Sequence, residues 1–143
     1  MSTFEMSEWV ACPPEEVFRF VTDTANAPKI SVSVQSMEKL TNGPLGIGTR
    51  YRETRLIDGK EQKAELEVVA FENGSRYSVQ NETQGIETLY EYVFNSENNG
   101  TRIKLTCNVT ANGLKKALVP VVANILKKED GDHLQRLKSV LEG

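Results

Sequence analysis

The residues best suited to chemistry in this chain lie on a short segment of alternating polar side chains. Tyr51, Glu53 and Arg55 are spaced two apart, so in a strand their side chains share one face. The aromatic member indicates that this face points inward. A carboxyl group in an apolar cavity has a raised pKa and can act as a general acid or base. A neighbouring guanidinium opposes that shift. An ion pair between Glu53 and Arg55 at a cavity wall or at a strand end is therefore the favoured interpretation, and Glu53 as an acid–base group is the alternative.

Asp130 and His133 form a second candidate pair. Their spacing of three residues on a helix brings the side chains together. A carboxylate beside an imidazole raises the imidazole pKa and fixes its tautomer, which suits a general base. The surrounding residues 127–132 are mostly charged, and Gly131 can turn the helix face. We therefore expect a solvent-exposed pair, and leave open a pair that faces a cavity.

Tyrosines on predicted strands are the third candidate group. Tyr77, Tyr90 and Tyr92 can line a pocket with their rings and orient a ligand with their hydroxyls, although the same pattern is typical of ordinary core packing. The residues that we predict to contact a ligand are Tyr51, Glu53, Arg55, Leu66, Tyr77, Tyr90, Tyr92, Val122 and Leu126.

Other sites for chemistry are not recognisable in the sequence. There is no Ser/His/Asp arrangement, no Cys/His spacing for a metal and no phosphate-binding glycine loop. Gly46-Ile47-Gly48 precedes a predicted strand rather than a helix, so it is not a dinucleotide fingerprint. We expect no metal and no cofactor.

The elements that must position these residues are short strands separated by tight turns. Asp58-Gly59, Asn73-Gly74, Gln84-Gly85 and Asn98-Asn99-Gly100 can supply the positive φ angles of hairpin turns. Between the turns apolar residues alternate, most clearly in the set Ile103, Leu105, Cys107 and Val109. This pattern predicts an antiparallel meander with one covered face and one wet face.

Helices are predicted near both ends of the chain. Pro13-Pro14-Glu15-Glu16 reads as a helix start that ends near Asp23. A second helical pattern runs from about Gly113 almost to the end, where Pro120 either kinks it or lies near its start. One stripe comprises Val119, Val122, Ala123, Leu126, Leu134, Leu137 and Leu141. A second stripe comprises Leu114, Leu118, Val121 and Ile125, so the first half is apolar all round.

The composition is that of an ordinary globular protein. The 143 residues are 38% hydrophobic and 26% charged, and we expect one domain, 1–143. A net charge of -3 provides no basic footprint for nucleic acid. The start of the chain does not resemble a signal peptide, and no apolar segment is long enough to span a bilayer. Cys12 and Cys107 are interpreted as buried thiols. We therefore expect a cytoplasmic location.

Three motifs resemble a known superfamily. They are similar to segments of the SRPBCC (START-like) superfamily, in its polyketide cyclase/dehydrase and lipid-transport branch. The three motifs are Cys12-Pro13-Pro14-Glu15-Glu16-Val17-Phe18, Gly46-Ile47-Gly48-Thr49-Arg50-Tyr51 and Leu134-Gln135-Arg136-Leu137-Lys138-Ser139-Val140-Leu141-Glu142. The likeness covers essentially the whole chain. It implies an α+β helix-grip fold, in which a curved seven-stranded antiparallel sheet wraps around a long C-terminal helix, with short helices between strands 1 and 2. The tryptophan often found after the proline of that short helical region is absent at Pro28-Lys29-Ile30-Ser31; the single tryptophan is Trp9.

The resemblance leaves three functions open, since this fold hosts many. The favoured one is non-catalytic binding, transport or sensing of a small hydrophobic, lipid-like or polycyclic ligand between sheet and helix, which requires an adequate cavity. The second is a polyketide cyclase or dehydratase that uses acid–base catalysis, which requires Glu53 to point inward. The third is a regulatory protein-interaction domain, which requires the second stripe to be exposed. Whether the chain forms a homodimer stays open.

Overall fold

The sheet is one continuous antiparallel layer of seven strands. The computed structural model describes all residues, 1–143, and the strands are hydrogen-bonded in the order β1-β7-β6-β5-β4-β3-β2. Their bounds are β1 Ser2–Val10, β2 Val34–Lys39, β3 Arg50–Ile57, β4 Lys60–Glu72, β5 Arg76–Thr83, β6 Ile86–Glu97 and β7 Gly100–Ala111. Register shifts between Val34 and Ser36 and between Val68 and Ala70 mark bulges, which increase local twist and bending. The meander and the curved sheet that the sequence and the resemblance predict are both confirmed.

The tight turns form because the residues at their centres tolerate left-handed backbone. Asp58 and Gly59 have φ angles of 50° and 76°, and Gln84 and Gly85 have 52° and 83°. Two consecutive positive φ angles are what a two-residue hairpin turn between right-twisted strands requires. These turns set the register that points Glu53 and Arg55 of β3 and Tyr90 and Tyr92 of β6 toward the helices.

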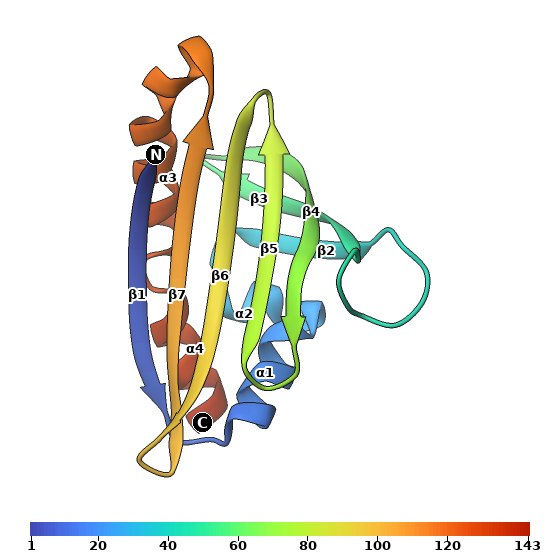
Figure 1. The fold of residues 1–143 in the computed structure, drawn as a ribbon, viewed down its shortest axis with the longest axis vertical. Helices are drawn as coiled ribbons and strands as arrows, with labels where there is room; N and C mark the ends of the chain where they lie inside the picture. The colour runs from blue at the N-terminus through green and yellow to red at the C-terminus, as the bar shows by residue number, and fades with distance from the viewer.

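The helices lie on one face of the sheet (Figure 1). They are α1 Pro14–Thr22, the short 3-10 helix η1 Thr24–Asn26, α2 Ala27–Ile30, a second 3-10 helix η2 Gly113–Leu118, α3 Val119–Asp130 and α4 His133–Glu142. No helix is long and apolar enough to cross a membrane. The arrangement is the helix-grip fold that the motifs imply.

The C-terminal helical region differs from a single continuous helix. It begins with η2, Pro120 occupies the first turn of α3, and residues 131–132 separate α3 from α4. Proline is tolerated in a first turn because the N–H that it lacks has no partner there. Gly131 marks the interruption: its backbone dihedrals stay helical, and a Cβ at this position would lie 2.6 Å from the carbonyl oxygen of Lys127. The two helices can therefore present different faces to the sheet.

The core contains two clusters of buried side chains. The larger has 16 residues, including Val17 and Phe18 of α1, Ile103 and Leu105 of β7 and Leu134 and Leu137 of α4. The smaller consists of Cys107, Val109, Val119 and Ala123, where α3 packs on β7. Both cysteines are buried and free, which confirms their predicted role as small apolar residues.

Candidate functional site

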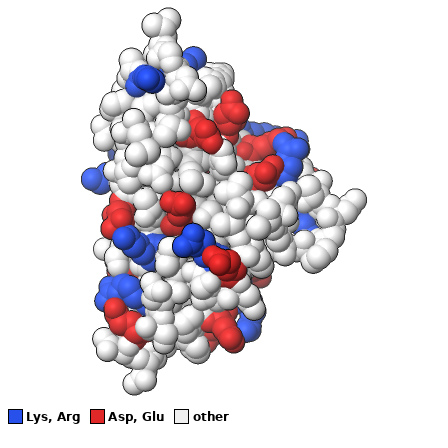
Figure 2. Space-filling view, viewed as in Figure 1, with Lys and Arg blue, Asp and Glu red and all other residues white.

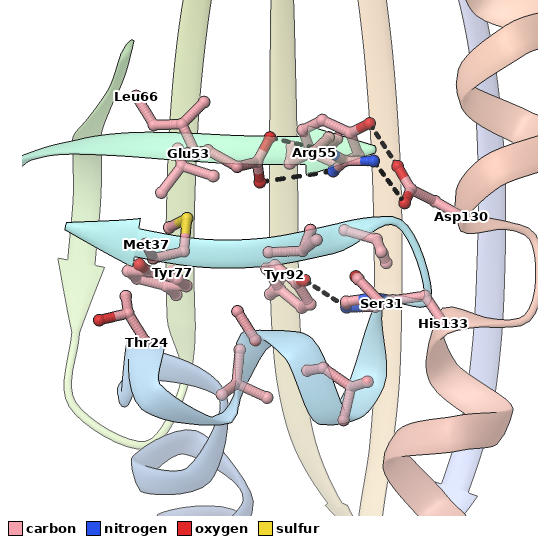
Figure 3. A pocket seen from close by; sticks show the side chains of 17 residues that line it. Thr24, Ser31, Met37, Glu53, Arg55, Leu66, Tyr77, Tyr92, Asp130 and His133 are labelled. Carbon is pink, nitrogen blue, oxygen red and sulfur yellow. Dashed lines mark hydrogen bonds and ion pairs between the residues drawn. The ribbon is translucent and has the colours of Figure 1, made fainter. Parts of the chain in front are cut away.

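An internal cavity separates the sheet from α2 and from the junction of α3 with α4. Its volume is about 90 Å³, and 17 residues line it (Figure 3). Most of the wall is apolar, formed by Val21, Ala27, Ile30, Val34, Met37, Leu66, Val79 and Leu105 together with the rings of Tyr77, Tyr90 and Tyr92. The charged side chains gather with Ser31 and His133 at the end near the helical junction, whereas Thr24 lies away from that end (Figure 3). The cavity thus has an apolar body and a polar end.

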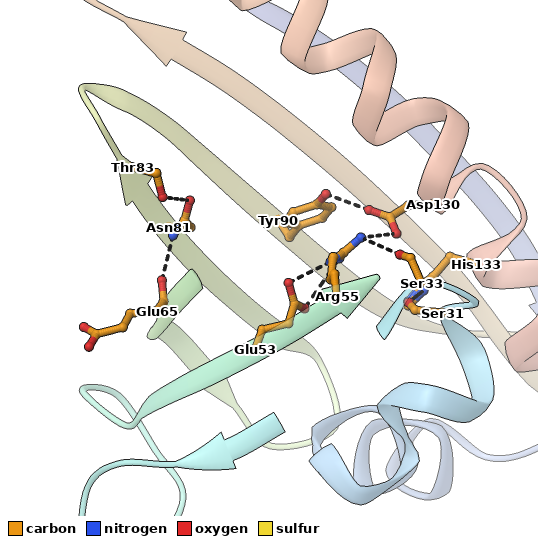
Figure 4. A network of polar contacts seen from close by, with 10 residues as sticks. All are labelled: Ser31, Ser33, Glu53, Arg55, Glu65, Asn81, Thr83, Tyr90, Asp130 and His133. Atoms are coloured by element: carbon orange, nitrogen blue, oxygen red, sulfur yellow. Dashed lines mark hydrogen bonds and ion pairs between the residues drawn. The ribbon is translucent and has the colours of Figure 1, made fainter. Parts of the chain in front are cut away.

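Arg55 is the centre of the polar end (Figure 4). Its Nε lies 2.7 Å from Glu53 Oε1, and its Nη1 lies 3.0 Å from Asp130 Oδ1. The guanidinium also donates to Ser33 Oγ at 3.3 Å. Alternation along β3 points Glu53 and Arg55 to the same face, while Asp130 reaches them from the last turn of α3. The pairing of Glu53 with Arg55, favoured from the sequence, is confirmed; of the two expected places the structure has the cavity wall, and it adds a second carboxylate.

Burial shapes the charge of this cluster. Only 13% of the Arg55 side chain and 3% of the Asp130 side chain are exposed. Burial by itself would lower the pKa of Arg55, but the carboxylates of Glu53 and Asp130 outweigh this and raise it above its ordinary value. A guanidinium held between two carboxylates stays charged, because each carboxylate favours the cation.

His133 forms a second polar chain beside the first. Ser31 Oγ lies 2.7 Å from its Nδ1, and the Tyr92 hydroxyl lies 2.7 Å from its Nε2. Burial lowers the pKa of His133, and the nearby Asp130 carboxylate only partly offsets that effect. A neutral imidazole has one N–H donor and one acceptor nitrogen. One of the two hydroxyls, of Ser31 or of Tyr92, therefore accepts from the imidazole N–H, and the other donates to the second ring nitrogen. The orientation of one hydroxyl thus constrains that of the other.

The three cavity tyrosines are neutral but differ in their partners. Burial raises the pKa of Tyr77, Tyr90 and Tyr92 above the ordinary value for a phenol. Tyr90 donates to Asp130 Oδ2 at 2.8 Å, and Tyr92 bonds His133. Tyr77 is 4% exposed and lines the cavity, and the hydrogen bonds of the other two hydroxyls have no counterpart at its own. That hydroxyl is free to contact a ligand.

The other predicted contact residues are divided by the fold. Leu66 lies in the cavity wall with Glu53, Arg55 and the three tyrosines. Tyr51 is buried in the larger core cluster but is outside the lining. Val122 and Leu126 of α3 pack on the smaller core cluster, away from the cavity. Helical periodicity identifies their inward face, but it does not show which part of the sheet that face meets.

The expectation of a solvent-exposed pair at Asp130 and His133 is wrong. Asp130 is 2% exposed and His133 is 7% exposed, and both line the cavity. The interruption at residues 131–132 separates α3 from α4. The charged residues 127–132 therefore do not lie on one solvent-exposed helix face. The two side chains bond to different partners rather than to each other. Asp130 lies four residues after Leu126 and His133 lies four before Leu137, so both fall on the otherwise apolar first stripe, and that placement was the usable signal.

Two serines of the site were missed from the sequence. Ser31 and Ser33 follow α2 and are 6% and 5% exposed. Serine is common in loops, and only the tertiary contacts with His133 and Arg55 distinguish these two. No group of three or more His, Cys, Asp or Glu side chains is placed to hold a metal ion.

The fold, with a cavity between its sheet and its helices, defines a helix-grip domain, and comparison with known proteins identifies its family. The model of the family described as "Polyketide cyclase / dehydrase and lipid transport" matches residues 1–142. The chain belongs to this family. Among curated protein sequences, none matches this chain.

Solved structures share the fold at low sequence identity. The crystal structure of Ara h 8.0201 is 20% identical, with a TM-score of 0.78 over 98% of this chain and 97% of that chain. TTHA0849 from Thermus thermophilus is 20% identical, with a TM-score of 0.76 over 96% of this chain and 95% of that one. The di-domain ARO/CYC BexL from the BE-7585A biosynthetic pathway is 19% identical, with a TM-score of 0.80 over 99% of this chain and 47% of that protein. These similarities establish the fold.

Proposed function

We propose that this protein binds a small molecule with an apolar body and a positively charged, hydrogen-bond-donating head in the cavity between the sheet and the helical junction. The observation that carries the proposal is the division of the cavity wall into an apolar body and a buried polar end. Ligand pockets in proteins combine apolar walls with a few placed polar groups in this way. Membership in a family described by cyclisation and lipid transport agrees with a ligand-binding role.

The size of the cavity limits the ligand. A volume of about 90 Å³ is well below the roughly 300–1,000 Å³ of pockets for drug-sized ligands. A lipid-like or polycyclic ligand would enter only if α2 and the helical junction moved away from the sheet. The geometry therefore supports a compact ligand over a lipid chain.

The charge of the polar end favours a donor on the ligand. Two carboxylates, Glu53 and Asp130, share the single guanidinium of Arg55, and burial keeps His133 neutral. The cluster thus holds one negative charge in excess, which is costly away from water. Glu53 accepts hydrogen bonds only from Arg55, whereas Asp130 also accepts one from Tyr90. An ammonium group on Glu53 would offset that charge, and the Tyr77 hydroxyl provides a second polar contact.

Three probes of matched shape test this proposal: isobutylamine, isobutanol and isobutyrate. Their binding to the full-length protein at pH 7 is measured by calorimetry and by NMR chemical-shift changes. Isobutylamine should bind most tightly and isobutyrate least. E53Q should remove the preference for the amine, while E65Q, which makes the same charge change at a half-exposed carboxylate outside the cavity wall, should keep it. Equal binding of amine and alcohol would remove the charge argument, and no binding of any probe would remove the proposal itself.

A polyketide cyclase or dehydratase is the second candidate, supported by the inward position of Glu53. Its side chain is 12% exposed and lines the same cavity as His133, so a carboxylate and an imidazole could both reach one substrate. The fold similarity to the ARO/CYC protein BexL agrees with this candidate. The test is incubation with a linear poly-β-carbonyl thioester, with mass spectrometry for a cyclised product that has lost water. Product formation that E53Q and H133Q both leave intact would argue against acid–base catalysis at this site.

A further inference from the structure

The second stripe of the C-terminal region forms an exposed apolar face. Leu114 of η2 is 96% exposed, and Leu118, Val121 and Ile125 are 44%, 56% and 45% exposed. On the opposite side of α3, Val119 and Ala123 are buried in the smaller core cluster. The rest of the chain therefore leaves these four residues, here called the η2–α3 face, between 44% and 96% exposed. A contiguous apolar surface of this kind marks an interaction site more often than scattered apolar residues do.

The charged residues of the segment that carries this face, residues 113–128, are all of one sign, and Glu129 follows at its end. Residues 113–128 contain Lys115, Lys116, Lys127 and Lys128 and no acidic residue, so this segment carries +4. Because the whole chain carries -3, the remaining residues carry -7. The four lysines are exposed, and none belongs to an ion pair. In the view of Figure 2, the tip of the molecule at η2 shows basic side chains without acidic ones beside them.

The exposed apolar residues and the lysines together favour one kind of binding partner for the η2–α3 face. A second copy of the chain, docked by its own η2–α3 face, would bring like-charged lysines together across a two-fold axis, which is unfavourable. An anionic bilayer accepts both features, because apolar side chains enter the boundary between headgroups and acyl chains while lysines remain among the anionic headgroups.

We propose that the η2–α3 face docks on an anionic membrane surface, with α3 lying in the plane of the interface. The same helix ends at Asp130 in the cavity wall, so the membrane and the cavity would contact the two ends of one element. The proposal is independent of the ligand that the cavity binds.

Co-sedimentation of the full-length protein with vesicles tests the proposal. One set consists of phosphatidylcholine, and the other also contains phosphatidylserine. Binding should require phosphatidylserine and should weaken as salt increases, since lysines near an anionic surface are screened. K115Q/K116Q should weaken binding by at least about tenfold, because each lysine contributes on the order of 1 kcal/mol at such a surface and 1.4 kcal/mol is tenfold. V121S/I125S should weaken it by removing the apolar contact.

Matched variants separate this face from a general charge effect. K60Q/K63Q makes the same charge change at exposed lysines on β4, and L56S removes an apolar side chain of the same 45% exposure on β3. Both should bind like the unmodified protein. Failure to bind phosphatidylserine vesicles at low salt overturns the proposal. So does a stable dimer in light scattering that V121S/I125S dissociates, since the face would then be a protein interface.

Discussion

The two C-terminal helices have similar lengths but very different relations to the rest of the molecule. Helix α4 buries Leu134 and Leu137 in the larger core cluster, where it contacts α2 and β1. Helix α3 lies over β1 and β7 and buries only Val119, Ala123 and Asp130, while Val121 and Ile125 stay exposed. An apolar composition therefore does not specify burial; the elements available to pack against each helix decide it.

The junction between these helices is where the cavity acquires its polar groups. Asp130 ends α3 and His133 begins α4, and each bonds to side chains from other elements. Substitutions in the buried face of α4, in the polar junction and on the exposed face of α3 should therefore change the free energy of unfolding by different amounts.

The largest effect is expected in the anchored helix. L137A removes a side chain that is fully buried, and it should lower the free energy of unfolding by about 3–4 kcal/mol through lost burial and the cavity that remains. V140A, on the same helix at 41% exposure, should change it by less than about 0.5 kcal/mol. Urea unfolding with an unchanged m-value measures both. Similar losses for the two variants would mean that α4 is not anchored by its inner face.

The next effect is expected at the junction. D130N removes the carboxylate that accepts from Arg55 and Tyr90, and it also removes the excess negative charge of the cluster. Arg55 keeps its pairing with Glu53, and the lost contacts should outweigh the relieved charge, so the expected loss is about 2 kcal/mol in the free energy of unfolding. D132N is the control, because its ion pair with Arg136 is largely exposed and should contribute less than about 1 kcal/mol. Guanidinium unfolding of both variants measures the difference, and a smaller loss for D130N than for D132N contradicts the buried network.

Acid should weaken the protein through its single histidine. The pKa of His133 is lowered in the folded state by burial, with Asp130 and Asp132 raising it and Arg55 lowering it, so the unfolded chain binds a proton at higher pH. Stability is therefore complete above the unfolded pKa near 6.5 and falls as the pH drops below it, by at most about 1.4 kcal/mol per pH unit. Unfolding at pH 7.5, 6.5 and 5.5 measures this slope. H133Q should flatten it, and an unchanged slope in that variant would assign it to other groups.

The smallest effect is expected on the open helix. I125S should change the free energy of unfolding by less than about 0.5 kcal/mol, because Ile125 is 45% exposed and gains little from folding. Thermal unfolding compares it with L126S, whose half-buried side chain packs on the smaller core cluster and should cost more. Equal costs would mean that α3 is covered on both sides in solution.

Local patterns accounted for much of the fold. Alternation at Ile103, Leu105 and Cys107 identified the inner face of β7, and Asp58-Gly59 identified a hairpin turn, because both depend on short-range geometry and steric limits. Alternation also placed Glu53 and Arg55 on one face of a strand, and the chemistry of the two groups was sufficient to predict their pairing. These features need no knowledge of distant contacts.

The sequence by itself thus determined the strands, the turns, the family and the ion pair on β3. Only the tertiary structure decided that Asp130 and His133 turn inward, that Ser31 and Ser33 join them, and that Val122 and Leu126 lie away from the cavity. The physical reason is that a helical pattern specifies which residues share a face, whereas burial depends on what lies opposite. A break of two residues between α3 and α4 changed that opposing surface.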